Sequence, residues 1–306
     1  MEKKDYFVLE SICQLRFQEA GPCFHVCTQE DLPIIFHNES EFKASMNVIA
    51  LVCICCPEVK VYTFAVMDNH LHFLAAGREE LILDFAGRII RRLALHPSLR
   101  ESCGDILKMT PKVHPIENVE NLRNVIAYIH RNGPLVNPDE SAFSYEWGAG
   151  RFFFNREAKA RFRESSHLAR QVEKRSLTKS HYLDHAGDVF VLDGYISPLC
   201  YCKVGEAELF FRNNRQYFYK VSKNIESQRD IAKTIGETIF YTDYDLIDVV
   251  TSACRKKYGV RNTAELNRES KIELAKTLRY EYNAGNKQIS RLLKISMETV
   301  SMLFSK

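Results

Sequence analysis

Two short runs rich in β-branched and aromatic residues, separated by a turn signal, constrain this chain more than any other feature. The first run is Lys60 to Met67 (KVYTFAVM), and the second is His70 to Ala75 (HLHFLA). Asp68-Asn69 between them is typical of a tight turn, and Gly77 ends the second run. The pair predicts two neighbouring strands of one sheet.

Helical and extended patterns alternate around this pair. We expect a further strand over 24–29, helices over 39–56, 78–95 and 118–131, and an edge strand at most over 108–116, because Pro111 and Pro115 cannot donate to a sheet ladder. This order predicts an α+β fold, an antiparallel sheet with packed helices. We assign residues 1–150 to this domain, 151–240 to a basic, mainly helical middle segment, and 241–306 to a helical domain.

Composition and charge exclude several classes of protein. Of the 306 residues 45% are hydrophobic, which is too many for a disordered chain, and no apolar run reaches the ~18 residues of a membrane span. We expect no secretory signal, ten reduced cysteines and a cytoplasmic location. The net charge is only +3, but residues 151–180 carry +6 and residues 251–306 carry +7. Two basic blocks favour a polyanionic partner; solvated helices are the alternative.

The second strand brings two imidazoles together. His70 and His72 are two residues apart, so a strand places both on one face and the pair can begin a metal site. A third ligand must come from elsewhere. On the helix over 118–131, Tyr128 and Asn132 lie one turn apart beside the apolar stripe. If that stripe packs on the sheet, Asn132 can offer an amide oxygen and Tyr128 a phenol above the histidines.

Four blocks resemble, in order, those of the single-tyrosine HUH transposases, in particular the REP-associated branch. They are FHVCTQ (24–29), VMDNHLHFLAAG (66–77), AYIHRNG (127–133) and FSYEWGAG (143–150). The resemblance implies a ferredoxin-like HUH nuclease core with Tyr128 as the nucleophile and His70, His72 and Asn132 as ligands of Mg²⁺ or Mn²⁺. It also implies nicking and joining of single-stranded or hairpin DNA through a 5′-phosphotyrosine, by a homodimer or a monomer.

Three departures from the family pattern leave alternatives open. Asp68 and Gly133 stand where proline is usual, and Thr28-Gln29 lacks the common arginine. The chain can therefore be a weakly active or inactive domesticated DNA-binding regulator with the same fold. An unrelated metallohydrolase using His70 and His72 with an acidic third ligand is the other alternative.

Two further groups of residues are candidates for DNA contacts. Arg88, Arg91 and Arg92 share one face of the helix over 78–95, where they either track a DNA backbone or form a solvated surface. Residues 285–304 have helix-turn-helix form and, with 248–281, loosely resemble the DNA-binding module at the end of the DnaA initiator. That resemblance implies duplex binding through Arg291, Lys294, Thr299 and Ser301; a helical cap on the middle segment is the alternative.

The cysteine pairs do not predict a zinc site. Cys53-x-Cys55-Cys56 and Cys200-x-Cys202 lack C-x-x-C spacing and lie in apolar surroundings. We expect reduced thiols, mostly buried.

Overall fold

The computed structural model describes residues 3–29, 32–133, 140–222, 241 and 243–304. The chain divides into two compact units, Met1–Ser222 and Lys223–Lys306. Each unit is considered by itself.

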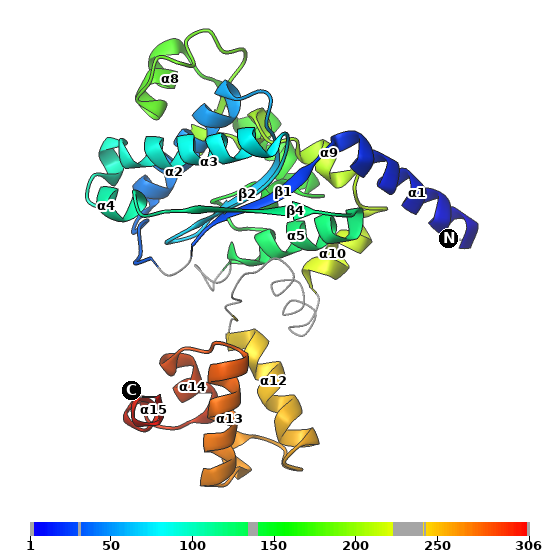
Figure 1. Ribbon diagram of the computed structural model, residues 1–306, viewed down its shortest axis with the longest axis vertical. Coiled ribbons are helices and arrows are strands. Elements are labelled where there is room, and N and C mark those ends of the chain that lie inside the picture. The colour runs from blue at the N-terminus through cyan, green and yellow to red at the C-terminus, as the bar shows by residue number, and fades with distance from the viewer. Residues whose placement is uncertain (1–2, 30–31, 134–139, 223–240, 242, 305–306) are drawn as a thin grey trace. The chain divides into compact units, whose positions relative to one another are not determined.

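The first unit is built on a four-stranded antiparallel sheet with the strand order β2-β3-β1-β4 (Figure 1). The predicted α+β class is confirmed, and the elements follow the expected order. Their bounds are β1 (Cys23–Thr28), α2 (Glu39–Cys55), β2 (Lys60–Val66), β3 (Leu71–Ala76), α3 (Glu79–Ala94), β4 (Pro111–Ile116) and α5 (Val119–Arg131). The short α4 (Cys103–Ile106) and a 3-10 turn, η1 (Pro97–Leu99), lie between α3 and β4. Strand β4 pairs only with β1, so its prolines stand at a sheet edge as expected.

The sheet carries helices on both faces (Figure 1). Phe73 of β3 meets Phe85 of α3, with ring centroids 5.8 Å apart, on the face that α2 and α3 cover. His72, the preceding residue, points to the opposite face, where its ring lies 5.6 Å from that of Tyr128 in α5. The alternation of β3 therefore separates an apolar core under α2 and α3 from a histidine-bearing face under α5.

Helix α5 begins and packs as its sequence predicts. Asn118 has extended backbone, and its side chain accepts a hydrogen bond from the Asn121 amide at 2.8 Å, which caps the first turn. The predicted apolar stripe of Leu122, Val125, Ile126 and Ile129 is at most 1% exposed. Residues 118–131 are thus held firmly enough against the sheet to position the residues that follow the stripe.

Helix α1 (Lys3–Ala20) is absent from our predictions. Cys13 and Phe17, one turn apart, are buried, and long-range polar contacts also hold the helix. Glu10 accepts from the Arg123 guanidinium of α5 at 2.7 Å and from Arg212 at 3.0 Å. Arg123 is only 1% exposed, so this ion pair joins the N-terminal helix to the core.

Residues 150–222 fold in the same unit as the sheet. They form the helices α7 (Arg156–Ser165), α8 (Gln171–Thr178), α9 (Val204–Glu208) and α10 (Asn214–Val221), the 3-10 turns η2 (Gly150–Phe152) and η3 (Pro198–Cys200), and the small antiparallel sheet β5 (His167–Leu168), β6 (Phe190–Leu192) and β7 (Tyr195–Ile196). The segment that we expected to be mainly helical therefore also contains strands. The 223–240 part of that prediction lies outside the described residues.

The described part of the second unit contains four helices around one core. They are α12 (Asp243–Lys256), α13 (Arg268–Glu281), α14 (Asn286–Leu293) and α15 (Met297–Phe304), with the 3-10 turn η4 (Thr263–Glu265). Buried residues from all four helices, among them Leu246, Leu278, Ile289 and Val300, share the core. A three-residue connection, 294–296, joins α14 to α15 as predicted.

Candidate active site

The face of the sheet under α5 carries a row of imidazoles from neighbouring strands. In the strand register His72 of β3 stands opposite Cys27 of β1. His25 of β1 stands between Leu74 of β3 on one side and His114 of β4 on the other. Side chains directly opposite one another share a face. The ring centroid of His25 lies 5.5 Å from that of His72 and 6.2 Å from that of His114. Register thus aligns three histidines, with His70 just before β3 as a fourth.

His70 and His72 approach each other through the nitrogens that a metal would use. Their Nε2 atoms are 2.9 Å apart, and both rings are at most 6% exposed. Asn69 Nδ2 donates to the Leu32 carbonyl at 2.9 Å, so Asn69 Oδ1 must accept from the Nδ1–H of His70 at 2.6 Å. A neutral His70 then has no proton on Nε2. The 2.9 Å approach is stable only with a proton or a cation between the two rings.

His25 occupies the other side of His72. Its Nε2 lies 3.3 Å from His72 Nδ1, and its ring is completely buried. If His72 Nδ1 donates to His25, then His72 Nε2 is free of hydrogen and both facing nitrogens can ligate one cation. A second residue that fixes the ring and tautomer of a ligating histidine is the usual arrangement at protein metal sites. Our sequence analysis did not single out His25, although the alternation of FHVCTQ places it on one strand face with Cys27.

Tyr128 lies directly against this row. Its ring makes edge-on contacts with His72, at 5.6 Å between centroids, and with His25, at 6.1 Å. The side chain is 4% exposed. The ring that we predicted to stand near the histidine pair is therefore close to it, but a substrate must gain access to a buried phenol.

Asn132 is the residue at which α5 ends, one turn beyond Tyr128. Its side chain is 6% exposed, and its Nδ2 atom has no hydrogen-bond partner among the described residues. A buried amide of this kind normally finds a partner, because leaving it unpaired costs about 1–3 kcal/mol. The free NH2 group is a donor, so it can bind an acceptor such as a phosphate oxygen; a cation would instead use the Oδ1 atom of the same amide.

Gly133 has a structural reason to replace the proline of the family pattern. A Cβ at this position would lie 2.4 Å from the Tyr145 ring, and Tyr145 in turn donates its hydroxyl to the Val66 carbonyl at 2.6 Å. Only glycine leaves room for this ring. The departure at residue 133 thus accompanies the packing of the block at 143–150.

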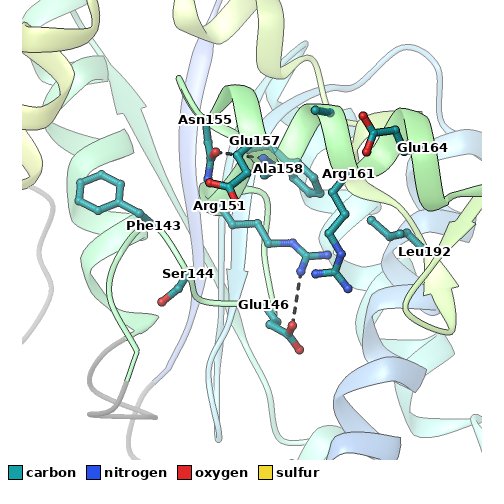
Figure 2. Close-up of a pocket in the computed structure, with 12 residues that line it drawn as sticks. Phe143, Ser144, Glu146, Arg151, Asn155, Glu157, Ala158, Arg161, Glu164 and Leu192 are labelled. Atoms are coloured by element: carbon teal, nitrogen blue, oxygen red, sulfur yellow. Dashed lines mark hydrogen bonds and ion pairs between the residues drawn. The ribbon is translucent and has the colours of Figure 1, made fainter.

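That block lines the outer edge of β2 and then borders a cavity. Gly148 pairs with Ala65, where a Cβ would meet the Phe64 carbonyl at 2.5 Å. A cavity of about 450 Å³ follows, between the block and α7 (Figure 2). Arg151 crosses it toward Glu146, at 3.5 Å, and donates to the Tyr195 hydroxyl at 2.6 Å. The guanidinium thereby ties the block to the small sheet.

His130 forms its hydrogen bonds with residues outside the imidazole row. Its Nε2 lies 2.7 Å from the Thr63 hydroxyl and its Nδ1 lies 2.8 Å from the Tyr217 hydroxyl. Burial lowers its pKa to about 3, so the ring is neutral at physiological pH. His130 joins α10 to the sheet and is not a member of the candidate site.

The predicted DNA-contacting arginines of α3 do not adjoin the imidazoles. Arg88, Arg91 and Arg92 belong to the helix that packs against Phe73, on the other face of the sheet from Tyr128. In the second unit, Arg291 is paired with Asp243 at 2.8 Å, and the Thr299 amide donates to the Ser296 hydroxyl that caps α15. Lys294 and Ser301 are exposed.

The cysteines that could be read as zinc ligands are reduced. Cys53, Cys56 and Cys202 are buried, Cys200 is partly buried and Cys55 is exposed. Burial raises the pKa of the Cys53 and Cys202 thiols well above the ordinary value, which disfavours the thiolate. In the part of the chain that the structure describes, no group of three or more His, Cys, Asp or Glu side chains is arranged to hold a metal ion.

Comparison with known proteins adds nothing to the geometry described above. Neither protein-family models, nor curated proteins, nor solved structures yield a match to this chain. Among the described residues, every helix is too short or too polar to cross a bilayer.

Proposed function

We propose that this protein is a metal-dependent, cytoplasmic nuclease and strand transferase for single-stranded DNA, with Tyr128 as its nucleophile. The observation that carries the proposal is the 2.9 Å approach of the His70 and His72 Nε2 atoms beneath the Tyr128 ring. Two nitrogens at this distance, with both Nδ1 atoms engaged elsewhere, form a bidentate site for one cation. The chain order strand-helix-strand-strand-helix-strand, with β1 and β3 at the centre of the sheet, supports a ferredoxin-like core.

The residues of the site have distinct roles in this proposal. His70, His72 and the amide oxygen of Asn132 would hold Mg²⁺ or Mn²⁺, a mixed nitrogen and oxygen set that suits these ions when phosphate oxygens complete it. The ion would polarise the phosphoryl oxygen and neutralise charge that develops during the reaction. Asn69 and His25 orient the two imidazoles.

Tyr128 carries the covalent step. Its phenolic oxygen bonds to the phosphorus of a phosphodiester, the phenolic proton passes to a base, and the bond from phosphorus to the 3′ oxygen breaks. The products are a 5′-phosphotyrosine and a free 3′-hydroxyl, and the reverse reaction rejoins a strand without ATP. A phenol ordinarily has a pKa of about 10, so activation by its surroundings is required.

The C-terminal unit would supply duplex binding. Helices α14 and α15 are joined by three residues; exposed Lys294 lies in this connection and exposed Ser301 lies within the second helix. A helix-turn-helix of this form places its second helix in the major groove, here with Thr299 and Ser301 toward the bases and Arg291 and Lys294 toward phosphates.

The burial of Tyr128 favours one second candidate. A phenol that is 4% exposed is also what a DNA-binding regulator with an inactive HUH-like core would contain. Such a protein binds hairpin DNA through the same fold without forming a covalent bond.

A covalent-adduct assay separates the two functions. The full chain is incubated with labelled hairpin oligonucleotides and Mn²⁺, then run under denaturing conditions. We expect a resistant protein–DNA adduct that Tyr128→Phe and His72→Ala abolish and that the exposed control Tyr280→Phe retains. Tight hairpin binding without an adduct from any hairpin substrate would establish the regulator instead.

A further inference from the structure

A groove of about 420 Å³ lies on the α2 and α3 side of the sheet. It runs between the C-terminal halves of these two helices and the segment that follows α8. The described residues that line it are Leu51, Val52, Cys55, Cys56, Arg88, Arg91, Arg92, Leu95 and Tyr182. Tyr182, from the segment after α8, lines the groove although the sequence of α3 gives no sign of it.

The groove is positively charged. Three of its lining side chains are guanidinium groups, and none of the described ones is a carboxylate. Asp84, one turn before Arg88 on α3, pairs with Arg88 at 2.6 Å and with Arg91 at 3.6 Å. One carboxylate that pairs with two of the three arginines leaves a net positive charge. Arg88 and Arg91 side chains are 52% and 62% exposed, so both can reach an anion in the groove.

The groove also offers flat apolar surface. Tyr182 is 68% exposed and Leu95 is 77% exposed, so both are accessible to a ligand. The Arg92 guanidinium stacks over the Tyr182 ring at 4.9 Å. The guanidinium holds the ring beside the basic row while most of its surface stays accessible. Buried Leu51 and Val52 belong to the apolar floor.

This combination matches one ligand chemistry. Guanidinium groups recognise phosphates, and an accessible aromatic ring stacks on a nucleobase. Arg88 and Arg91 are three residues, about 4.5 Å, apart along the axis of α3, and their long exposed side chains can reach neighbouring phosphates of a strand. We propose that this groove binds a single strand of nucleic acid, with its phosphates on Arg88 and Arg91 and a base on Tyr182.

The groove is separate from the candidate active site, because the sheet lies between α3 and Tyr128. A strand bound here is not the strand being cut. The inference therefore goes beyond the proposed reaction and holds whether or not Tyr128 forms an adduct.

Photocrosslinking tests the groove without involving the reaction. The full chain is mixed with a single-stranded octathymidylate that carries one 5-iodouracil, in EDTA so that no metal-dependent adduct forms, and is irradiated. Tryptic peptides are then sequenced by mass spectrometry. We expect a crosslink on peptide 180–203, localised to Tyr182.

A charge-matched pair of variants makes the result specific. Arg88→Ala with Arg91→Ala, which removes the two proposed phosphate contacts and keeps Arg92 over the Tyr182 ring, should lower the crosslink yield at Tyr182 at least tenfold. Arg156→Ala with Arg163→Ala, two exposed arginines of α7 outside the groove, should leave it unchanged. Equal losses in both pairs, or crosslinks that map only elsewhere, would overturn the proposal. So would 5-iodo-dUMP crosslinking to Tyr182 as efficiently as the octamer, because the site would then belong to a free nucleotide. Circular dichroism confirms that each variant is folded.

Discussion

At the scale of single residues, the site depends on how each imidazole is oriented. His70 is held by Asn69 at 2.6 Å, and His72 is held by the fully buried His25 at 3.3 Å. Neither contact reaches a substrate, but each determines which ring nitrogen is free. His114 stacks on the far side of His25, with ring centroids 6.2 Å apart.

We expect His25→Ala to weaken Mn²⁺ binding about 10- to 100-fold, because His72 would lose the partner that fixes its ring and tautomer. Isothermal titration of the full chain with MnCl₂ measures this effect. His25→Gln, which retains an acceptor, should recover part of the affinity. His114→Ala is the control and should bind Mn²⁺ as the wild type does. Wild-type affinity in His25→Ala would show that His25 only packs.

At the scale of elements, α5 connects folding to the site. The helix is capped by Asn118 at its start, buries its apolar stripe against the sheet and ends at Asn132. Tyr128 and Asn132 therefore keep their positions only while the whole helix stays docked. Capping is a local interaction, so its loss should affect the stability of the first unit more than its geometry.

Asn118→Ala should lower the free energy of unfolding of the first unit by about 1 kcal/mol, because the Asn121 amide loses its acceptor. Urea denaturation followed by circular dichroism measures the change. Asn118→Asp keeps a capping oxygen and should retain most of the stability. An equal loss in both variants would mean that the Asn118 side chain acts by some interaction other than the cap.

At the scale of the whole molecule, the chain divides into two units, and the imidazole site belongs to the first. Residues up to Ser222 contain the sheet, Tyr128 and the groove, while the four C-terminal helices have a core of their own. Each unit buries enough of its own apolar surface to have a distinct core. A division of labour between strand chemistry and duplex binding is the arrangement that we propose.

A chain ending at Ser222 should keep adduct formation on hairpin DNA and lose at least tenfold in affinity for duplex DNA. The salt dependence of duplex binding should also become shallower, since fewer phosphates are neutralised. Fluorescence anisotropy at several salt concentrations measures both quantities. Unchanged duplex affinity and slope would assign duplex binding to the first unit instead.

Local pattern determined much of this protein. Alternation and helical spacing predicted the four strands and the longer helices between residues 23 and 131, the shared face of His70 and His72, and the apolar stripe of α5. The short α4 and η1 and the cap by Asn118 were not predicted. Each of these features depends on residues within a few positions of one another, whose spacing follows from the geometry of a strand or a helix. Helix α1 escaped prediction because its decisive contacts, to Arg123 and Arg212, lie more than a hundred residues away.

Only the tertiary structure decided which distant side chains meet. The pairing register of β1 with β3 brought His25 to His72. The packing of α3 and α5 on opposite faces of the sheet put the α3 arginines on the face away from Tyr128. Packing of the segment after α8 placed Tyr182 on Arg92, ninety positions earlier. Register and layer are set by the summed burial of many side chains, and a periodic pattern records only which face a residue occupies, not what covers that face.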